Sequence, residues 1–576
     1  MAFSRAVRFV FSFIGAAIVL SMMGVMLMLF LSGRGPSIAE NSILWLRMPS
    51  SLGEQTPNDI FGLFEQRTTV RSVVDTLRKA KRDERISGVV IIPSTASAMW
   101  GKVQEVRDAV IDFKTSGKPI VAYLEFGAGQ AYYLATACDK IFLTPSSPLN
   151  LVGIATYDLF VKGLLDLVGV EADMLSAGEY KTAVNLYTET TYTPEHREMS
   201  ESLNRDMYNQ LVDGIAEGRE LAPSRVRDVI DQGPFIGNAA VRYELIDALT
   251  YEDEVVQELG LEEVPSIVDF ESYQAVTEES LGVLPGPRVA LIHAEGTIDF
   301  GANTVDVRGT RTTGSQTFVE AVREAGADTS IEAIVLRVDS PGGVAIAADI
   351  MWRELKLVSA KKPLIVSMSD LAASGGYYIA APAHAIVAQP GTLTGSIGVY
   401  GGKYVLDGVL EKVGVNVEEI TDGSQAGLYA PIGRFSTAAR SALQAQMDET
   451  YERFLHVVAE GRGMTRAEVD ALARGRVWTG QQAFDHGLVD ALGGLRSALD
   501  LVKVEIGADS ETDVVLVPYP TPSSLFDTVI DSLSTQSQSK VAEWLMPLSA
   551  RSLWSFRSFL QKTVGQPLAL MPVSAP

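Results

Sequence analysis

The chain has 576 residues, which is too long for one ordinary hydrophobic core and predicts two or three domains. Its 48 basic and 71 acidic residues give a net charge of −23, which argues against nucleic-acid binding, because phosphate contacts need clustered Lys and Arg. With five His and one Cys, a disulfide within the chain is excluded and a multi-ligand zinc site is not expected, so no metal or cofactor is predicted.

The N-terminal segment contains a long apolar run. Phe9 to Leu31 is 23 residues without a charge, and at about 1.5 Å rise per residue a helix of this length spans a bilayer. A cleaved signal peptide has only roughly 7–15 apolar residues, so the run predicts an uncleaved transmembrane anchor rather than a leader or a buried helix. Arg5 and Arg8 precede the run and Arg34 follows it, which places the N-terminus in the cytoplasm by the positive-inside rule. The remainder is then expected outside the membrane, which in a Gram-negative bacterium is the periplasm.

The sequence after this run contains two similar copies of one segment. "AYYLATACDKI" at 131–141 matches "GYYIAAPAHAI" at 376–386 with an offset of 245 residues, and "YNQLVDGIAEGR" at 208–219 matches "YERFLHVVAEGR" at 451–462 with an offset of 243. A register held this far predicts a tandem duplication of one domain. The predicted division is a cytoplasmic tip with the anchor, a first copy, an acidic linker, a second copy and a C-terminal extension, at residues 1–35, 36–250, 251–287, 288–510 and 511–576.

Each copy alternates short β-branched runs with longer helical patterns. In the second copy strands are predicted at 288–294, 331–339 and 363–369, and helices at 313–327, opened by a Thr or Ser cap, and 345–360. Such alternation predicts an α/β fold in which helices cover a parallel sheet.

The two copies differ at positions suited to chemistry. Ser374 in the second copy aligns with Gly129, and "SPGG" at 340–343 aligns with "TASA" at 95–98. In the other direction, Lys181 of the first copy aligns with Ala426. One copy therefore carries a serine and a glycine pair, and the other carries a lysine.

These residue types fit a nucleophile and its base. A serine hydroxyl needs a base to remove its proton, and a lysine amine can be that base if burial disfavours its charged form. A Ser–Lys pair is a known variant of the catalytic triad. Ser374 precedes a predicted helix, and the backbone N–H groups of Gly342, Gly343 and Gly375 are candidates for an oxyanion hole.

Two other bases are possible. His384 follows the serine in a helical stretch and is interpreted as a surface or packing residue, and Lys403 is a rival lysine 29 residues beyond Ser374. Each motif taken alone has an ordinary structural explanation, because Ser-Gly-Gly and "SPGG" are common turns. Their complementary division between the copies favours catalysis.

At these residues the chain resembles the signal peptide peptidase A family, the Ser–Lys serine peptidases of family S49, in its long, duplicated bacterial form. The motifs that carry the resemblance are "GEYKTAV", "RVDSPGG", "SDLAASGGYYIAA" and "GTLTGSIGV". The resemblance implies ClpP/crotonase-like copies, Ser374 as nucleophile, Lys181 as general base and Ser396 as the residue that orients the lysine. It further implies a homotetramer in the bacterial inner membrane that degrades cleaved signal peptides. Asp339, where Asn is common in this family, and the C-terminal tail depart from the pattern.

Other functions stay open at this point. A crotonase-like enzyme acting on acyl-CoA would need no serine nucleophile, a catalytically dead membrane scaffold would need no lysine, and a ClpP-like Ser-His-Asp protease would depend on His384. The sequence also leaves open whether Ser374 meets the lysine of its own chain or of a neighbour.

Overall fold

The computed structural model describes residues 38–49, 51–55, 68–94, 99–259, 265–306, 309–521 and 568–570, together with position 24. The predicted membrane-spanning run 9–31 and most of the predicted C-terminal extension lie outside these residues. Within the described ranges, no helix has both the length and the apolar character needed to cross a membrane.

The first copy is built on a six-stranded sheet in the order β10-β1-β2-β3-β5-β9. All five neighbouring pairs are parallel. The strands are β1 (Ser42–Arg47), β2 (Ile86–Ile92), β3 (Ile120–Leu124), β5 (Lys140–Leu143), β9 (Ala248–Leu249) and β10 (Ser266–Asp269). The predicted linker 251–287 therefore also supplies a strand, β10, to the first sheet.

The second copy has an eight-stranded sheet whose main path is β21-β19-β17-β15-β11-β23, with β18 beside β17 and β22 beside β18. Its pairs are parallel except β19 with β21. The strands are β11 (Arg288–Glu295), β15 (Ala333–Ser340), β17 (Leu364–Ala373), β18 (Ala385–Ala388), β19 (Leu393–Gly395), β21 (Val477–Thr479), β22 (Ala491–Leu492) and β23 (Val515–Tyr519). The strands predicted at 288–294, 331–339 and 363–369 are thus confirmed, and β23 adds part of the predicted C-terminal extension to this sheet.

The helices repeat with the offsets found in the sequence. α3 (Trp100–Lys114) and α13 (Ala345–Ser359) are 245 residues apart at both ends, and α7 (Pro194–Arg219) and α16 (Thr437–Arg462) are 243 apart at both ends. α12 (Ser315–Ala327) also lies where it was predicted, but the expected Thr or Ser cap is wrong: its N-cap is Gly314, without a side-chain cap. The duplication therefore extends to the boundaries of individual helices.

The remaining elements are short or lie around these sheets. A small sheet joins β4 (Gly127–Ala128), β6 (Pro148–Asn150) and β8 (Phe235–Ile236). The other helices are α2 (Val70–Arg82), α4 (Gly129–Ala135), α5 (Lys162–Val168), η1 (Thr182–Val184), α6 (Asn185–Thr188), α8 (Pro223–Ile230), α9 (Asn238–Arg242), η2 (Glu252–Glu254), α10 (Val255–Glu258), α11 (Phe270–Gln274), η3 (Glu279–Leu281), α14 (Gly375–Ala380), α15 (Asp407–Lys412), α17 (Arg466–Leu472), α18 (Gly480–Asp485) and α19 (Leu495–Ile506).

A third sheet joins the two copies. Its seven strands run in the order β13-β14-β12-β16-β24-β20-β7, and β7 comes from the first copy. β7 pairs antiparallel with β20 over seven residue pairs, from Val399 with Ala177 to Val405 with Glu171. The strands are β7 (Glu171–Ala177), β12 (Thr297–Asp299), β13 (Thr304–Val305), β14 (Arg311–Gly314), β16 (Gly342–Val344), β20 (Val399–Val405) and β24 (Leu568–Leu570).

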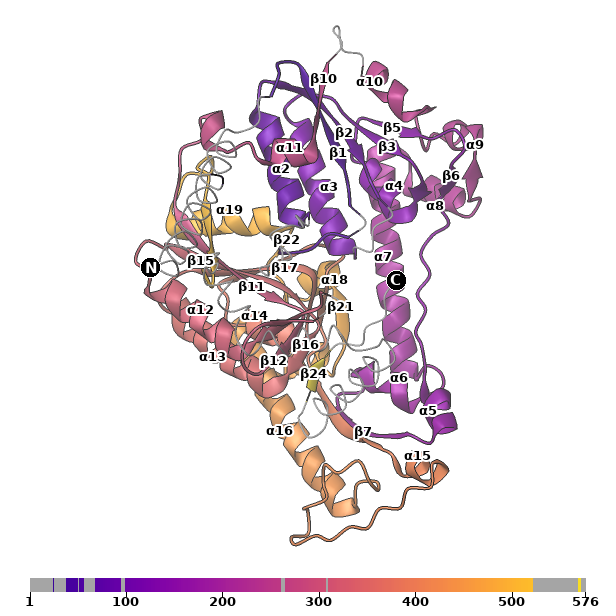
Figure 1. The fold of residues 1–576 in the computed structure, drawn as a ribbon, viewed down its shortest axis with the longest axis vertical. Coiled ribbons are helices and arrows are strands. Elements are labelled where there is room, and N and C mark those ends of the chain that lie inside the picture. Colours follow the sequence, from indigo (N-terminus) through magenta and orange to yellow (C-terminus); the bar gives the residue numbers. More distant parts are fainter. Residues whose placement is uncertain are drawn as a thin grey trace, which may run out of the picture.

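The hydrophobic cores are likewise not separate. The core of the first copy includes Ala373, Leu393 and Val477 of the second. In Figure 1 the first sheet lies at the top, the second lies below it, and α7 runs down one side past both. Because apolar packing crosses the boundary between the copies, residues far apart in sequence are held in one arrangement.

Candidate active site

Ser374 occupies a sharp turn between β17 and α14. Its φ of 55° and ψ of −114° are unusual for a residue with a side chain, and such strain persists only where the surroundings enforce it. Its N–H donates to the carbonyl oxygen of Gly395 at 2.8 Å, and its own carbonyl accepts from the N–H of Tyr378 at 2.9 Å. In the first copy the aligned residue Gly129 is the first residue of α4 and does not have a positive φ. The strained turn is therefore specific to the copy that carries the serine.

The turn at residues 340–343, called the glycine turn below, lies against α14, the helix that follows Ser374. A side chain at Gly376 would approach the carbonyl oxygen of Ser340 to 2.8 Å, which explains the second glycine after Ser374. Gly342 has φ of 98°, and a side chain at Gly343 would overlap the carbonyl oxygen of Ile298 at 1.9 Å. Both positions therefore need glycine, and they bring bare backbone next to the turn of the serine.

The amide of Gly342 is already engaged. Its N–H donates to Ser340 Oγ at 3.1 Å, and Ser340 Oγ in turn donates to the carbonyl oxygen of Gly296 at 2.6 Å. This bond weighs against Gly342 as an oxyanion donor, whereas Gly343 and Gly375 keep that predicted role as candidates.

Lys181 reaches the serine within the same chain. Its Nζ lies 2.7 Å from Ser374 Oγ, 2.8 Å from the carbonyl oxygen of Ser396 and 2.9 Å from Ser396 Oγ. Lys181 is 1% exposed, and both serines are fully buried. The structure thus brings together three of the predicted site residues, from positions 193 and 215 residues apart in sequence.

The strand pair between the copies places the lysine. Ala177, at the end of β7, is paired with Val399, at the start of β20. Lys181 follows β7 by four residues and Ser396 precedes β20 by three, so both side chains emerge at the same end of this ribbon. Ser396 itself has φ of 50°, and its N–H donates to the carbonyl oxygen of Arg476 at 2.6 Å.

Gly475 is a supporting residue that the motifs did not reveal. A side chain there would come within 2.4 Å of the backbone nitrogen of Lys181, and its φ of 85° also suits glycine. At the offset of 243 it aligns with Gln232, so the comparison of copies that singled out Ser374 could have found it.

Burial determines the electrostatics of Lys181. The loss of hydration lowers its pKa well below the usual value for lysine, and among the residues that the structure describes no neighbouring charge opposes this effect. An ammonium here would lack the paired carboxylate that buried charges need. The site therefore favours the neutral amine, which is the form that can accept a proton.

The two rival bases lie elsewhere. His384 is exposed, and its Nδ1 accepts from the N–H of Leu364, at the start of β17, whereas Ser374 follows the end of this ten-residue strand. A strand of that length spans roughly 30 Å, so His384 lies far from Ser374. Lys403 lies on β20 beside Asp173 of β7, with its Nζ over the ring of Phe435 at 4.7 Å. Of these three candidates, Lys181 is the one whose side chain contacts Ser374.

Comparison with known proteins agrees with the duplication. The family model described as "Peptidase family S49" matches residues 112–263 and again 356–509. The chain belongs to peptidase family S49. It is 32% identical to "Serine protease SPPA, chloroplastic" of Arabidopsis thaliana over 86% of this chain and 74% of that protein. It is 30% identical to "Protease 4" of Salmonella typhi over 88% of this chain and 82% of that protein.

Membership of family S49 confirms the family resemblance and makes the chain a serine peptidase with two S49 domains. Among solved structures, a ClpP1 variant from Listeria monocytogenes matches 37% of this chain and 95% of that chain, with 15% identity and a TM-score of 0.24. The α/β architecture and the duplication are confirmed, and the ClpP/crotonase-like description of each S49 copy stays a prediction.

Proposed function

We propose that this S49 peptidase is a Ser–Lys endopeptidase that hydrolyses extended apolar peptides of the signal-peptide class at a membrane. The observation that carries the proposal is the 2.7 Å contact between Ser374 Oγ and the buried amine of Lys181. A crotonase-like acyl-CoA enzyme or an inactive scaffold would have no use for a neutral lysine held against a strained serine.

The surroundings of Lys181 match the bonds of a neutral amine. Such an amine has two N–H donors and one lone pair. The carbonyl oxygen and the hydroxyl of Ser396 can accept the two N–H groups, which leaves the lone pair for the hydroxyl proton of Ser374. Ser396 thereby orients the lysine, as the resemblance implies.

Acylation follows from this arrangement. As Ser374 Oγ bonds to the carbonyl carbon of the scissile peptide, its proton passes to Lys181 Nζ, and the carbonyl oxygen becomes an oxyanion. The N–H groups of Gly343 and Gly375 are the proposed donors to that oxyanion, and one such donor typically contributes about 3 kcal/mol to the transition state. The C–N bond then breaks, and the ammonium of Lys181 returns the proton to the leaving amine.

Deacylation uses the same groups in the reverse direction. A water molecule attacks the ester carbon of the acyl-enzyme and gives a proton to Lys181, and the second tetrahedral intermediate again places its negative charge at the two amides. The ester C–O bond breaks, Ser374 recovers the proton, and the peptide leaves with a new carboxylate.

The strand arrangement supports an extended substrate. β24, which is Leu568–Leu570 of the C-terminal tail, pairs antiparallel with β16, the strand that contains Gly342 and Gly343. It also pairs with β20 at Tyr400. A peptide added as a strand in this place gains main-chain hydrogen bonds next to the glycine turn, and "LAL" is as apolar as a signal peptide.

The predicted location supports the same substrate class. Released signal peptides are apolar and partition into the bilayer, so an enzyme held there by the run 9–31 meets them at high local concentration. We include in the proposal a single-pass anchor in a bacterial inner membrane with the peptidase part in the periplasm. The homotetramer stays a prediction from the family resemblance.

The substrate class is tested with paired peptides. A Leu- and Ala-rich peptide and a peptide of equal length with Glu and Lys at alternate positions are incubated with the full chain, and products are followed by mass spectrometry. We expect internal cleavage of the apolar peptide with at least roughly tenfold higher kcat/KM, because each buried apolar side chain contributes about 1.5–3 kcal/mol. Equal rates, or preference for the charged peptide, would refute the substrate class while leaving the dyad intact.

A chain ending at residue 521 lacks β24 and tests the binding mode. We expect kcat/KM for short apolar peptides to rise about two- to tenfold, because a tethered segment competes at an effective concentration of about millimolar. Added "LALMPVSAP" peptide should restore the inhibition, and the control is the full-length chain with the same additions. Unchanged kinetics with and without the peptide would show that the tail does not occupy the substrate position.

A further inference from the structure

The strand that leads to Ser374 is irregular just before the serine. On β15 and β17, Val338 is paired with Met368 and Ser340 with Ala372. The interval is two residues on β15 (340 − 338) and four on β17 (372 − 368), so β17 contains two additional residues between these pairs. This bulge, defined here as residues 369–371, directly precedes the serine turn, and such bulges often redirect a strand next to an active site.

Side chains satisfy the backbone groups of the bulge. Asp339 Oδ1, from β15, accepts from the N–H of Leu371 at 3.1 Å. Thr392 Oγ1 donates to the carbonyl oxygen of Ser369 at 2.6 Å. The conformation of the bulge therefore depends on where the Asp339 carboxylate is held.

Lys102 of the first copy holds both acidic groups. It lies in the first turn of α3, where its N–H donates to Asp370 Oδ1 at 2.8 Å. Its Nζ lies 2.5 Å from Asp339 Oδ2 and 3.0 Å from Asp370 Oδ2. A side chain at Gly101 would meet the carbonyl oxygen of Ser369 at 2.8 Å, so α3 packs directly on the bulge.

Lys102 differs electrostatically from the other buried lysine, Lys181. Burial alone would lower its pKa, but the charges of Asp339, Asp370 and Glu54 raise it well above the usual value. Lys102 is 6% exposed, and its raised pKa favours the ammonium form. The first copy therefore contributes one buried lysine favoured as a neutral amine and one that is charged.

The two carboxylates stand close to the reacting groups along the chain. Asp339 precedes Gly342 by three residues, and Asp370 precedes Ser374 by four. The ion pairs of Lys102 with both carboxylates therefore connect the end of β15, which leads to the glycine turn, to the end of β17, which leads to Ser374.

Comparison of the copies shows that the two do not share this arrangement of side chains. At the offset of 245, Lys102 aligns with Ala347, Asp339 with Ser94 and Asp370 with Glu125. The second copy thus has alanine where the first has the lysine, and the first copy has serine at the position of Asp339 but keeps an acid, Glu125, at the position of Asp370. Lys102 and Asp339 are therefore divided between the copies as Lys181 and Ser374 are, whereas Asp370 is not.

We propose that Lys102 is a positioning residue for peptide hydrolysis, which fixes Ser374 relative to the glycine turn by binding Asp339 and Asp370 together. The inference rests on the proposed function of Ser374 and Lys181. Lys102 contacts neither Ser374 nor Lys181 and acts through the bulge.

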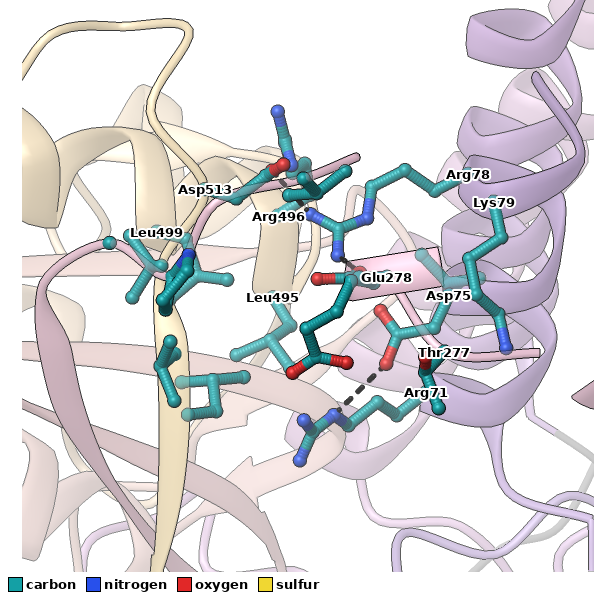
Figure 2. Close-up of a pocket in the computed structure, with 18 of the residues that line it drawn as sticks. Arg71, Asp75, Arg78, Lys79, Thr277, Glu278, Leu495, Arg496, Leu499 and Asp513 are labelled. Atoms are coloured by element: carbon teal, nitrogen blue, oxygen red, sulfur yellow. Dashed lines mark hydrogen bonds and ion pairs between the residues drawn. The ribbon is translucent and has the colours of Figure 1, made fainter. Parts of the chain in front are cut away.

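A second ion pair between the copies provides a matched control. Arg78 of α2 binds Asp513, the residue two before β23, at 2.8 Å and also pairs with Glu278, as Figure 2 shows. It lies in a cavity between α2, the segment 276–286 and α19. Arg78→Met therefore weakens the contact between the copies at residues that belong to neither the glycine turn nor the serine turn.

The experiment compares kcat, KM and the melting temperature Tm of the full chain with those of Lys102→Met, Asp370→Asn, Lys102→Met/Asp370→Asn and Arg78→Met. We expect Lys102→Met to lower kcat by roughly 10²-fold with little change in KM, because a displacement of about 1 Å costs a rate factor of that order. Arg78→Met should lower Tm but keep kcat. Lys102→Met leaves the Asp370 carboxylate without its cation, and Asp370→Asn removes that charge. The double variant should therefore have a higher Tm than Lys102→Met but an equally low kcat.

The outcomes separate the inference from the proposed function. If kcat follows Tm across all the variants, or if Lys102→Met and Asp370→Asn keep kcat within about twofold of the unchanged chain, Lys102 is only structural. Should Lys102→Met fail to fold, Asp370→Asn decides, since it keeps the size and the acceptor for the N–H of Lys102. The unchanged chain is also treated with a fluorophosphonate: failure to label Ser374 there would refute the proposed function itself.

Discussion

Ser374→Ala is expected to lower kcat for peptide hydrolysis by roughly 10⁴- to 10⁶-fold, the range found when serine peptidases lose a member of the catalytic set. The hydroxyl of Ser374, which follows the end of β17, forms the bond to the acyl group, and alanine has no atom that can form this bond. Cleavage of an apolar peptide and labelling by a fluorophosphonate, located by peptide mapping, measure the effect.

Ser374→Gly is the matched control for folding. Both substitutions remove the nucleophile, but glycine adopts the φ of 55° found at position 374 without strain. The aligned residue of the first copy, Gly129, does not have a positive φ. We expect the glycine variant to be inactive and about 1 kcal/mol more stable than the alanine variant in urea unfolding. Substantial activity in either variant would mean that another residue is the nucleophile.

Lys181→Met is expected to lower kcat by roughly 10⁴-fold or more while leaving the chain folded. Methionine has a similar length and fills the buried site, but it cannot accept the proton of Ser374. Lys181→Arg should be equally inactive, because a guanidinium stays protonated in proteins. Lys403→Met, which changes the other lysine near this sheet, is the control and should keep kcat within about tenfold of the unchanged chain.

The pH profile distinguishes a base from a structural lysine. Since burial lowers the pKa of Lys181, the amine is protonated and inactive below that lowered pKa and neutral and active above it. We expect kcat/KM to rise with pH through this pKa and then to level off below the usual lysine value of about 10.4. The residual rate of Lys181→Met should lack this rise. A wild-type profile that is flat from acid to alkaline pH would contradict the assignment.

Much of the site was predictable because the duplication provides its own comparison. Ser374 against Gly129 and Lys181 against Ala426 stand out where the surrounding sequence is alike. The same comparison would have shown Lys102 against Ala347, but a single lysine at the start of a helix is normally solvated, so nothing in the sequence marked it as buried.

The position of Gly342 shows where motif reasoning exceeded its basis. The sequence placed two glycines at the turn and made both oxyanion donors, but the side chain of Ser340 takes up the Gly342 amide. Side-chain bonds of this kind depend on the exact course of the turn, which a motif does not specify.

Hydrophobic periodicity and the repeat determined the α/β elements, their duplication and the identity of the serine and the lysine, because these depend on local patterns. Only the tertiary structure decided that the two meet within one chain, since their contact depends on the pairing of β7 with β20 and on close backbone packing at Gly475. It also decided which short segments become strands: β10, β23 and β24 carry weak patterns of their own and take their conformation from the sheet edges they pair with. The stability of such a pairing depends on segments far apart in the chain, so no single segment reveals it. For that reason the third sheet, which joins the two copies, could not be predicted from the sequence.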